Sequence, residues 1–218
     1  MIQMKLLASR EDWLKERGLR IGGSDAACLI GLNPWKSNVD LFREKTGEKP
    51  QDDLSGNEAV RYGSEAEEHI REIFRLNHPE LDLQYEPGNL WINDDCPFAH
   101  ASLDGWLMGR EKVDGILEIK TATIRSDLQK NRDWYGRIPD HYYCQVQWYM
   151  MVTGASFTWL YALLRMPYTR GACDELSDLR GYYIPRDGEA IEMLAEAGSA
   201  FYEAIKLGEE PALILPEI

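Results

Sequence analysis

The 218-residue chain has few of the side chains that build disulfide or zinc frameworks. Its four cysteines are far apart and form no CxxC pair, which predicts reduced thiols. Its four histidines lack the spacing of metal ligands, so we expect ordinary polar or capping roles for them. These residues are Cys28, Cys96, Cys144 and Cys173, and His69, His78, His100 and His141.

Long apolar runs and an excess of positive charge are also missing. No run approaches the length of a membrane span, and the first residues, MIQMKLLASRED, lack a signal-peptide pattern. A cytoplasmic location without a membrane partner is therefore expected. The net charge of −13 argues against a broad nucleic-acid-binding surface. A narrow basic channel is still compatible with it, because the local field and not the total charge attracts a polyanion.

The composition that is present is typical of a folded domain. Apolar residues make up 44% of the chain, and there are seven tryptophans and eleven tyrosines. The length predicts one domain, residues 1–218, with a sizeable core. The polar stretch 48–57 is expected to be a loop within this domain, because the motifs on both sides of it belong to one site.

A Gly- and charge-rich turn between two short apolar runs, within HASLDGWLMGREKVDGILEIKTA (100–122), predicts a β-hairpin. Asp104 lies on its first arm and Glu118 on its second, followed by Lys120. Because side chains alternate across a strand, Glu118 and Lys120 share one face while their aliphatic neighbours pack on the other. Pairing of the arms would bring Asp104 near them. Two carboxylates beside a lysine can hold Mg²⁺ and activate water against a phosphodiester.

This D…ExK spacing resembles the core of PD-(D/E)xK nucleases, with Leu103 in place of the usual proline. The pattern is short and occurs by chance in many chains. The alternative is a solvated hairpin in which Lys120 forms a surface ion pair with Glu118 and contributes little stability. The core motif alone does not separate these two interpretations.

A helix is predicted over Gly63–Leu76, with Ser64 as its N-cap. Glu67 borders the apolar stripe of this helix, whereas Glu65 and Glu68 lie on the far side. A carboxylate at the edge of the core needs a partner, which a metal site, water or Arg71 could provide. The predicted stripe consists of Ala66, Ile70, Ile73 and Phe74.

The segment Glu11–Asn33 predicts a helix, a glycine break and a second helix capped by Ser24 and Asp25. A helix start with a hydroxyl and free backbone N–H groups can bind an anion, and Arg17 and Arg20 precede it. An ordinary capped helix is the simpler explanation of this segment taken by itself.

Four later segments complete the expected core. His141–Val152, ended by Gly154, is apolar nearly all round and predicts a buried helix. Gln145 and Gln147 interrupt it, and one of them is expected to face a polar active site because a buried amide must be hydrogen-bonded. A buried strand is predicted over 157–164, and helices over 39–46 and 187–206. The basic and aromatic stretch 123–140 suits a single-strand contact, but a solvated loop and helix explains it more simply.

Five blocks taken in order resemble the phage lambda-type exonuclease family, also called YqaJ-like viral recombinases: RGLRIGGSDAACLIGLNPW, YGSEAEE, SLDGW, LEIKTA and YYCQVQWYMMVTGA. The resemblance covers residues 13–155, and its Gly-Ser and QVQ blocks are more specific than D…ExK. It implies an α/β fold with a PD-(D/E)xK restriction-endonuclease-like core, a central mixed β-sheet flanked by helices. It also implies a Mg²⁺-dependent 5′-to-3′ exonuclease on linear double-stranded DNA, which leaves a 3′ single-stranded tail.

The resemblance also implies roles for individual residues. Asp104 and Glu118 match the family's metal carboxylates, and Lys120 matches its catalytic lysine. Glu67 matches a helix-borne acidic residue, and Gln145 matches a glutamine that orients the attacking water or the lysine.

Further implications concern the cofactor and the DNA end. Two Mg²⁺ ions, or Mn²⁺ in their place, would lie among the three carboxylates, with the backbone carbonyl of Ile119 as a further ligand. Arg17 and Ser24 match the family's pocket for a 5′-phosphate. Gly22 stands where the lambda-type protein has threonine, so one phosphate contact is missing or is replaced by a backbone N–H.

Implied partners are double-stranded DNA, a single-strand annealing protein and two further copies of the chain in a ring-shaped homotrimer. A phage or prophage gene in a bacterial host would fit this set. Alternatives are another nuclease with the same core, such as a RecB-like one, or a catalytically silent DNA-binding module. A RecB-like nuclease with an iron–sulfur cluster would need clustered C-terminal cysteines, and only Cys173 lies in the last third.

Overall fold

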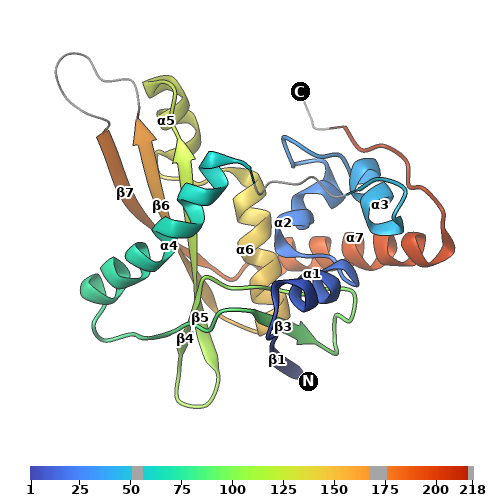
Figure 1. Ribbon diagram of the computed structural model, residues 1–218, viewed down its shortest axis with the longest axis horizontal. Coiled ribbons are helices and arrows are strands. Elements are labelled where there is room, and N and C mark those ends of the chain that lie inside the picture. The colour runs from blue at the N-terminus through green and yellow to red at the C-terminus, as the bar shows by residue number, and fades with distance from the viewer. Residues whose placement is uncertain (51–55, 167–175, 216–218) are drawn as a thin grey trace.

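The computed structural model describes residues 1–50, 56–166 and 176–215, and a five-stranded mixed sheet forms its centre (Figure 1). The strand order is β2-β4-β5-β6-β7, in which β5 and β6 are parallel and the other neighbours are antiparallel. A separate antiparallel pair is formed by β1 and β3. The strands are β1 (Ile2–Leu6), β2 (Asp82–Gln84), β3 (Asn89–Asn93), β4 (Gly105–Met108), β5 (Val113–Thr123), β6 (Phe157–Met166) and β7 (Leu176–Pro185).

Helices cover both faces of this sheet (Figure 1). α4 crosses one face, and α6 lies on the other, where α2 and α7 pack against it. The chain passes from β5 to the parallel strand β6 through α5 and α6, the crossover that parallel pairing requires. The helices are α1 (Arg10–Gly18), α2 (Gly23–Ala26), the 3₁₀ helix η1 (Ala27–Ile30), α3 (Asn38–Thr46), α4 (Glu58–Asn77), α5 (Asp127–Trp134), α6 (Asp140–Thr153) and α7 (Gly188–Leu207).

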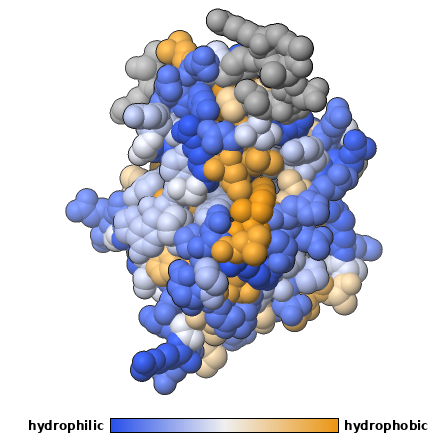
Figure 2. All heavy atoms as spheres, turned by 90° about the vertical axis from the view of Figure 1, so that its left-hand side faces the viewer, coloured by the Kyte–Doolittle hydropathy of each residue, from blue (hydrophilic) through white to orange (hydrophobic). Residues whose placement is uncertain are grey.

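The core is divided by the sheet because successive residues of each central strand point to opposite faces. On the α6 side, Ile116 and Leu160 join the larger cluster, which includes the fully buried Trp148. On the α4 side, Leu117 and Tyr161 pack with Phe74. Figure 2 shows that apolar atoms form a narrow band among hydrophilic ones on the side of the molecule where α4 and β7 lie.

The predicted hairpin, the helices at 39–46, 141–152 and 187–206 and the strand at 157–164 are confirmed to within a few residues. The ends of these helices follow from their capping residues. Ser37 accepts a hydrogen bond from the Asp40 backbone N–H at the start of α3. Gly47 and Gly154 end α3 and α6 with positive φ values of 81° and 72°, a backbone conformation that favours glycine.

The predicted start of α4 is wrong. The helix begins at Glu58, because the side chain of Asn57 accepts the N–H groups of Ala59 and Val60, and Ser64 is not the cap. Gly63 therefore lies inside the helix. A Cβ at that position would approach Thr121 Oγ1 to 3.0 Å, so glycine allows a close contact between α4 and β5.

The buried stripe of α4 is also different from the prediction at one position. Ile70 and Phe74 are buried, but Ile73 is 38% exposed. Arg71 is buried instead, because its guanidinium packs 3.8 Å from the ring centroid of Tyr85 and donates a hydrogen bond to the backbone of Asp104. Periodicity of apolar residues could not identify a buried arginine.

The second predicted helix of the N-terminal segment is a single turn, α2, that continues as the 3₁₀ helix η1. Its cap is Gly22, so Ser24 and Asp25 lie within the turn and are not caps. The strands β1 and β7 were not predicted from the sequence.

Cys28, Cys96 and Cys144 are buried free thiols, and Cys173 lies outside the described residues. The predicted loop 48–57 is described only in part, because residues 51–55 are not included. No helix in the described part of the chain is long and apolar enough to cross a membrane.

Candidate active site

The β4–β5 hairpin brings the predicted acidic residues together. Asp104 directly precedes β4, whose first residue, Gly105, pairs with Leu117 of β5. The Asp104 carboxylate Oδ2 accepts a hydrogen bond of 2.8 Å from the backbone N–H of Ile119. Asp104 is thereby fixed at the end of the hairpin beside Glu118, as the motif spacing predicts.

Glu118 is the centre of a buried polar cluster. It is 2% exposed, and its Oε1 lies 2.6 Å from the Lys120 Nζ. Gln145 of α6 donates its Nε2 to the same oxygen at 2.9 Å and also to Tyr149 Oη at 2.9 Å. The interpretation as a solvated hairpin is therefore wrong, and Gln145 is the glutamine that faces the polar cluster.

Gln147 has a different role on the same helix. Its side chain donates to the Pro185 carbonyl at 3.0 Å and accepts the Asp187 backbone N–H at 2.9 Å. It therefore ties α6 to the start of α7, away from Glu118.

Burial of the cluster and the charges within it shift the pKa values of its ionisable groups. Burial raises the pKa of Glu118 to about 8, with a further contribution from the Asp104 charge. Burial also raises the pKa of Asp104, although Lys120 opposes this. Burial alone would lower the pKa of Lys120, but the acidic groups around it, Glu118 first, together more than offset this effect and raise that pKa above its ordinary value. Lys120 is therefore protonated over the physiological range.

Glu67 reaches the same cluster from the α4 side. Burial raises its pKa to about 7, as does the nearby Asp104 charge, whereas Arg71 and Lys120 lower it. Arg71 lies 3.9 Å from the Glu67 Oε2 and donates to the Asp104 carbonyl at 3.2 Å. Glu65 and Glu68 are exposed, so the structure places only Glu67 of these three beside the hairpin.

The donor set fits a divalent cation. Glu118 Oε2 is buried and has no hydrogen-bond partner among the described residues, which is costly for a carboxylate oxygen. The Asp104 charge raises the pKa values of Glu67 and Glu118, and a hard cation with oxygen ligands would relieve that repulsion. Among the described residues, however, no three His, Cys, Asp or Glu side chains already converge on one point. Ile119 lies between Glu118 and Lys120 on β5, and no contact identifies its carbonyl as a ligand.

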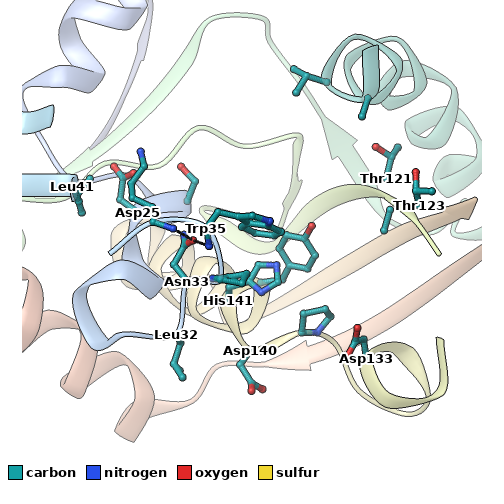
Figure 3. Close-up of a pocket in the computed structure, with 18 of the residues that line it drawn as sticks. Asp25, Leu32, Asn33, Trp35, Leu41, Thr121, Thr123, Asp133, Asp140 and His141 are labelled. Carbon is teal, nitrogen blue, oxygen red and sulfur yellow. Dashed lines mark hydrogen bonds between the residues drawn. The ribbon is translucent and has the colours of Figure 1, made fainter. Parts of the chain in front are cut away.

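Arg17 and Ser24 line a cavity of about 1550 Å³ that extends to the end of β5 and to α6 (Figure 3). The Arg17 guanidinium lies 4.1 Å from the ring centroid of Trp13. A smaller hollow of about 290 Å³, lined by Glu67 and Lys120, shares Thr121 with the large cavity. Two of the predicted catalytic residues and the two predicted phosphate-binding residues therefore border adjoining hollows.

The His100 ring accounts for glycine at position 22, where the lambda-type protein has threonine. A Cβ on Gly22 would lie 2.9 Å from the His100 ring, which also lines the cavity. The Gly22 N–H is not free, because Asp25 Oδ2 accepts it at 3.3 Å. Lys45 lies 3.4 Å from that carboxylate and donates to the Arg20 carbonyl at 2.6 Å.

Sequence reasoning missed two residues that support the site, Tyr149 and Lys45. It gave Arg71 only as a possible partner of Glu67. Tyr149 follows Gln145 by four positions, so helical spacing could have suggested their contact. It also explains Gly23, since a Cβ there would approach the Tyr149 ring to 2.3 Å. Arg71 follows Glu67 by four positions, which signals their ion pair, but its hydrogen bond to the Asp104 carbonyl joins segments distant in sequence. Lys45 carries no comparable signal, because it donates to the distant Arg20 carbonyl.

A mixed sheet between helices, with the Asp, Glu and Lys of one hairpin clustered on it, defines the class of PD-(D/E)xK nuclease folds. An alkaline exonuclease from Laribacter hongkongensis has this fold with a TM-score of 0.65 and 20% identity, over 92% of this chain and 94% of that chain. A phage-related exonuclease from Haemophilus somnus 129PT aligns with a TM-score of 0.52 and 16% identity, over 87% of this chain and 96% of that one.

The chain belongs to the YqaJ-like viral recombinase domain family, whose model matches residues 12–156. The uncharacterized protein YqaJ of Bacillus subtilis (strain 168) is 31% identical over 206 residues, 94% of this chain and 59% of that protein. The chain thus spans about three fifths of the length of this relative. The family and the fold class predicted from the sequence are confirmed.

Proposed function

We propose that the chain is a metal-dependent deoxyribonuclease that digests linear double-stranded DNA from 5′ to 3′ and leaves 3′ single-stranded tails. The observation that carries this proposal is the buried cluster of Asp104, Glu118, Lys120 and Gln145 on a nuclease fold. Such burial of charge costs stability and is common at functional sites. Two solved structures with this fold are of exonucleases, which supports the reaction class.

Each side chain of the cluster would have a separate role in catalysis. Lys120, held by Glu118 and protonated, would orient the attacking water or stabilise negative charge developing on the phosphate. Gln145 would fix the Glu118 carboxylate, and its own position is fixed by Tyr149. The Ile119 N–H would hold Asp104 in its orientation.

Asp104, Glu118 and Glu67, with the Ile119 carbonyl, would hold two Mg²⁺ ions, or Mn²⁺ in their place. Such ions, when bound, lower the pKa of a water and stabilise the leaving 3′-oxygen. Glu118 Oε2 is the oxygen available for this purpose, because Oε1 already accepts two hydrogen bonds.

The direction of digestion would be set by the N-terminal side of the cavity. Arg17 is a planar donor suited to phosphate oxygens, and Ser24 adds a hydroxyl on the same cavity. α2 has only one turn and the Gly22 N–H is occupied, so side chains rather than a helix N-terminus would supply most of the contact.

Assembly and partners follow from the family and the charge. A chain of net charge −13 would hold DNA best where basic side chains from several copies converge, as in a closed homotrimer. A single-strand annealing protein would use the 3′ tail. The proposed setting is the cytoplasm of a bacterial host, from a phage or prophage gene.

One gel assay tests the core of the proposal. Linear duplex carrying a label at either the 5′ or the 3′ end is incubated with the protein in Mg²⁺ or in EDTA. We expect the 5′ label to be released early in the presence of Mg²⁺ and not to be released in EDTA. Cleavage inside a closed circular duplex, early loss of the 3′ label, or no digestion in Mg²⁺ or Mn²⁺ would contradict it.

A further inference from the structure

An exposed tryptophan stands at the large cavity on a well-defined turn. Trp35 is 74% exposed and lies between η1 and α3. The side chain of Asn33 accepts the backbone N–H groups of Trp35 at 2.9 Å and of Lys36 at 3.0 Å. This Asx turn fixes the backbone that carries the indole, so the ring is presented to the cavity with little loss of freedom.

Trp35 is the outer member of an aromatic series that leads to the candidate catalytic lysine. Its ring centroid lies 4.8 Å from that of His141, at an interplanar angle of 82° (Figure 3). The His141 centroid lies 4.1 Å from that of Tyr142, whose ring in turn lies 5.0 Å from the Lys120 Nζ. Three short contacts thus connect the exposed indole to the Glu118–Lys120 pair.

Exposure alone would not distinguish this residue, since single exposed apolar side chains are normal. Leu76, Leu128 and Tyr135 are each more than 75% exposed. None of the three lines the cavity, whereas Trp35, His141 and Tyr142 all do. The position of Trp35, and not its exposure, requires an explanation.

Six basic and four acidic side chains line the cavity, an excess of positive charge that suits a nucleic-acid strand. Arg17 and Arg125 line it, and within the described part of the chain neither forms an ion pair. Thr121 and Thr123, at the end of β5, lie across the cavity from Trp35 (Figure 3). Free cations for the backbone together with an aromatic face for a base are the combination that binds single strands.

We infer that Trp35, supported by His141, stacks on an unpaired nucleobase of the DNA strand next to the phosphate held at Asp104, Glu118 and Lys120. This inference rests on the proposed function and identifies a specific base-binding position within it. The stack would stabilise a terminal nucleotide that has left its base pair, and it would be tolerant of sequence because every base has a flat π face.

The state of His141 supports this arrangement. Its Nε2 is buried and, in the part of the chain that the structure describes, has no hydrogen-bond partner, an unusual condition for a ring nitrogen. Burial lowers the pKa of His141 to about 4, with a contribution from the Lys120 charge, so the ring is neutral at physiological pH. A neutral imidazole packs against the indole without repelling the nearby cations, and a nucleotide could satisfy its nitrogen.

The test measures binding without cleavage. The probe is a 5′-phosphorylated linear duplex with 2-aminopurine as its 5′-terminal base opposite a mismatch, titrated in EDTA with the wild-type protein, Trp35→Ala, Trp35→Phe and Tyr135→Ala. Tyr135→Ala is the matched control, because Tyr135 is 76% exposed and lies outside the cavity wall. Stacking quenches the fluorescence of 2-aminopurine, so each titration reports both Kd and the environment of the base.

Trp35→Ala should raise Kd about tenfold, the effect of one lost base–aromatic stack, and should abolish the quenching. Trp35→Phe should retain most of both, and Tyr135→Ala should match the wild type. With 2-aminopurine at an interior paired position instead, the fluorescence of the bound probe should not depend on Trp35. The inference is overturned if Trp35→Ala behaves like Tyr135→Ala, or if the wild type does not bind the probe.

Digestion of the same duplex in Mg²⁺ separates this result from the proposed function. A wild type that digests the duplex while Trp35→Ala binds normally would refute only the stacking role. A wild type that binds through Trp35 but never cleaves would refute only the nuclease. If the stacking role and the nuclease activity are both confirmed, Trp35→Ala should raise KM more than it lowers kcat, as expected for a residue that binds and does not react.

Discussion

The hairpin cluster and the N-terminal wall of the cavity border adjoining hollows but differ in how they are built. Glu118 is 2% exposed and is held by Lys120 and Gln145, whereas Ser24 is exposed and lies in a single helical turn. In the first region hydrogen bonds fix each charged group before any ligand arrives. In the second region Ser24 is exposed and Arg17 is half-buried against the Trp13 ring, and both face the cavity that a ligand would enter. Substitutions should therefore affect chemistry in the first region and substrate binding in the second.

The largest effect is expected within the hairpin cluster. Glu118→Gln keeps the size of the side chain but removes the charge that pairs with Lys120, and it should reduce kcat on the order of a thousandfold. Glu65→Gln, on the exposed side of α4, is the matched control and should retain activity. Kinetics on linear duplex in Mg²⁺ measure both. Substantial turnover by Glu118→Gln would show that the cluster is not catalytic.

A second comparison uses two buried glutamines of α6. Gln145→Leu removes the amide that orients Glu118 and should lower kcat by roughly tenfold to a hundredfold. Gln147→Leu leaves the Asp187 N–H and the Pro185 carbonyl without partners, so it should cost ~1–3 kcal/mol of unfolding free energy instead. Urea denaturation and steady-state kinetics on both variants measure the difference. Equal kcat losses in both would remove the special role of Gln145.

On the cavity wall, Arg17→Ala should slow digestion of 5′-phosphorylated duplex by about tenfold and affect 5′-hydroxyl duplex much less. Arg20→Ala should be milder, since Arg20 is engaged with the Pro97 carbonyl and Glu16. Both substrates are compared at one salt concentration, because phosphate contacts depend on salt. An equal loss on the two substrates would assign Arg17 to general DNA affinity or folding.

The smallest expected effect is a change in the free energy of unfolding with pH. Glu67 and Glu118 have pKa values of about 7 and about 8 in the folded chain, above their ordinary 4.5. At pH values between 4.5 and these raised pKa values, Glu67 and Glu118 are protonated in the folded chain but deprotonated in the unfolded chain. In EDTA, the free energy of unfolding should therefore fall as pH rises from about 5 to about 8.

Mg²⁺ binds the deprotonated carboxylates of the folded chain, so the stability that it restores should be largest above about pH 7. Urea denaturation at several pH values, with EDTA or Mg²⁺, measures both trends. Glu118→Gln should flatten the pH dependence in EDTA. Stability that rises with pH over this range in EDTA would contradict the burial of these carboxylates.

The sequence predicted the hairpin cluster better than the cavity wall for a physical reason. Alternation along β5 fixes which side chains share a face, so Glu118 and Lys120 could be placed from their spacing alone. Helical spacing likewise separated Glu67 from Glu65 and Glu68, even though the start of α4 was misplaced. The periodicity within an element therefore identifies which residues share a face, even when the predicted start of that element is wrong.

The cavity wall depends on contacts between segments far apart in the chain, which periodicity does not contain. Gly22 has no Cβ because His100 occupies that space, and Lys45 reaches the backbone of Arg20. Trp35 lies just beyond the segment Glu11–Asn33, and its contact with His141 appears only once the chain has folded. The roles of Arg17 and Ser24 came from the family resemblance, and they stay predictions.

The parallel pairing of β5 with β6 has a consequence for folding. The β4–β5 hairpin is a local structure and can form early, which would bring Asp104 close to Glu118 within one short loop. Glu118 pairs with Leu160 only after the chain has closed the long crossover that contains α5 and α6, a slower event because of its loop entropy. Gln145 lies on that crossover, so the carboxylates should meet before the amide that orients them arrives. During that interval a nascent chain would carry an acidic hairpin with no amide to fix Glu118, and activity should appear in refolding later than compaction does.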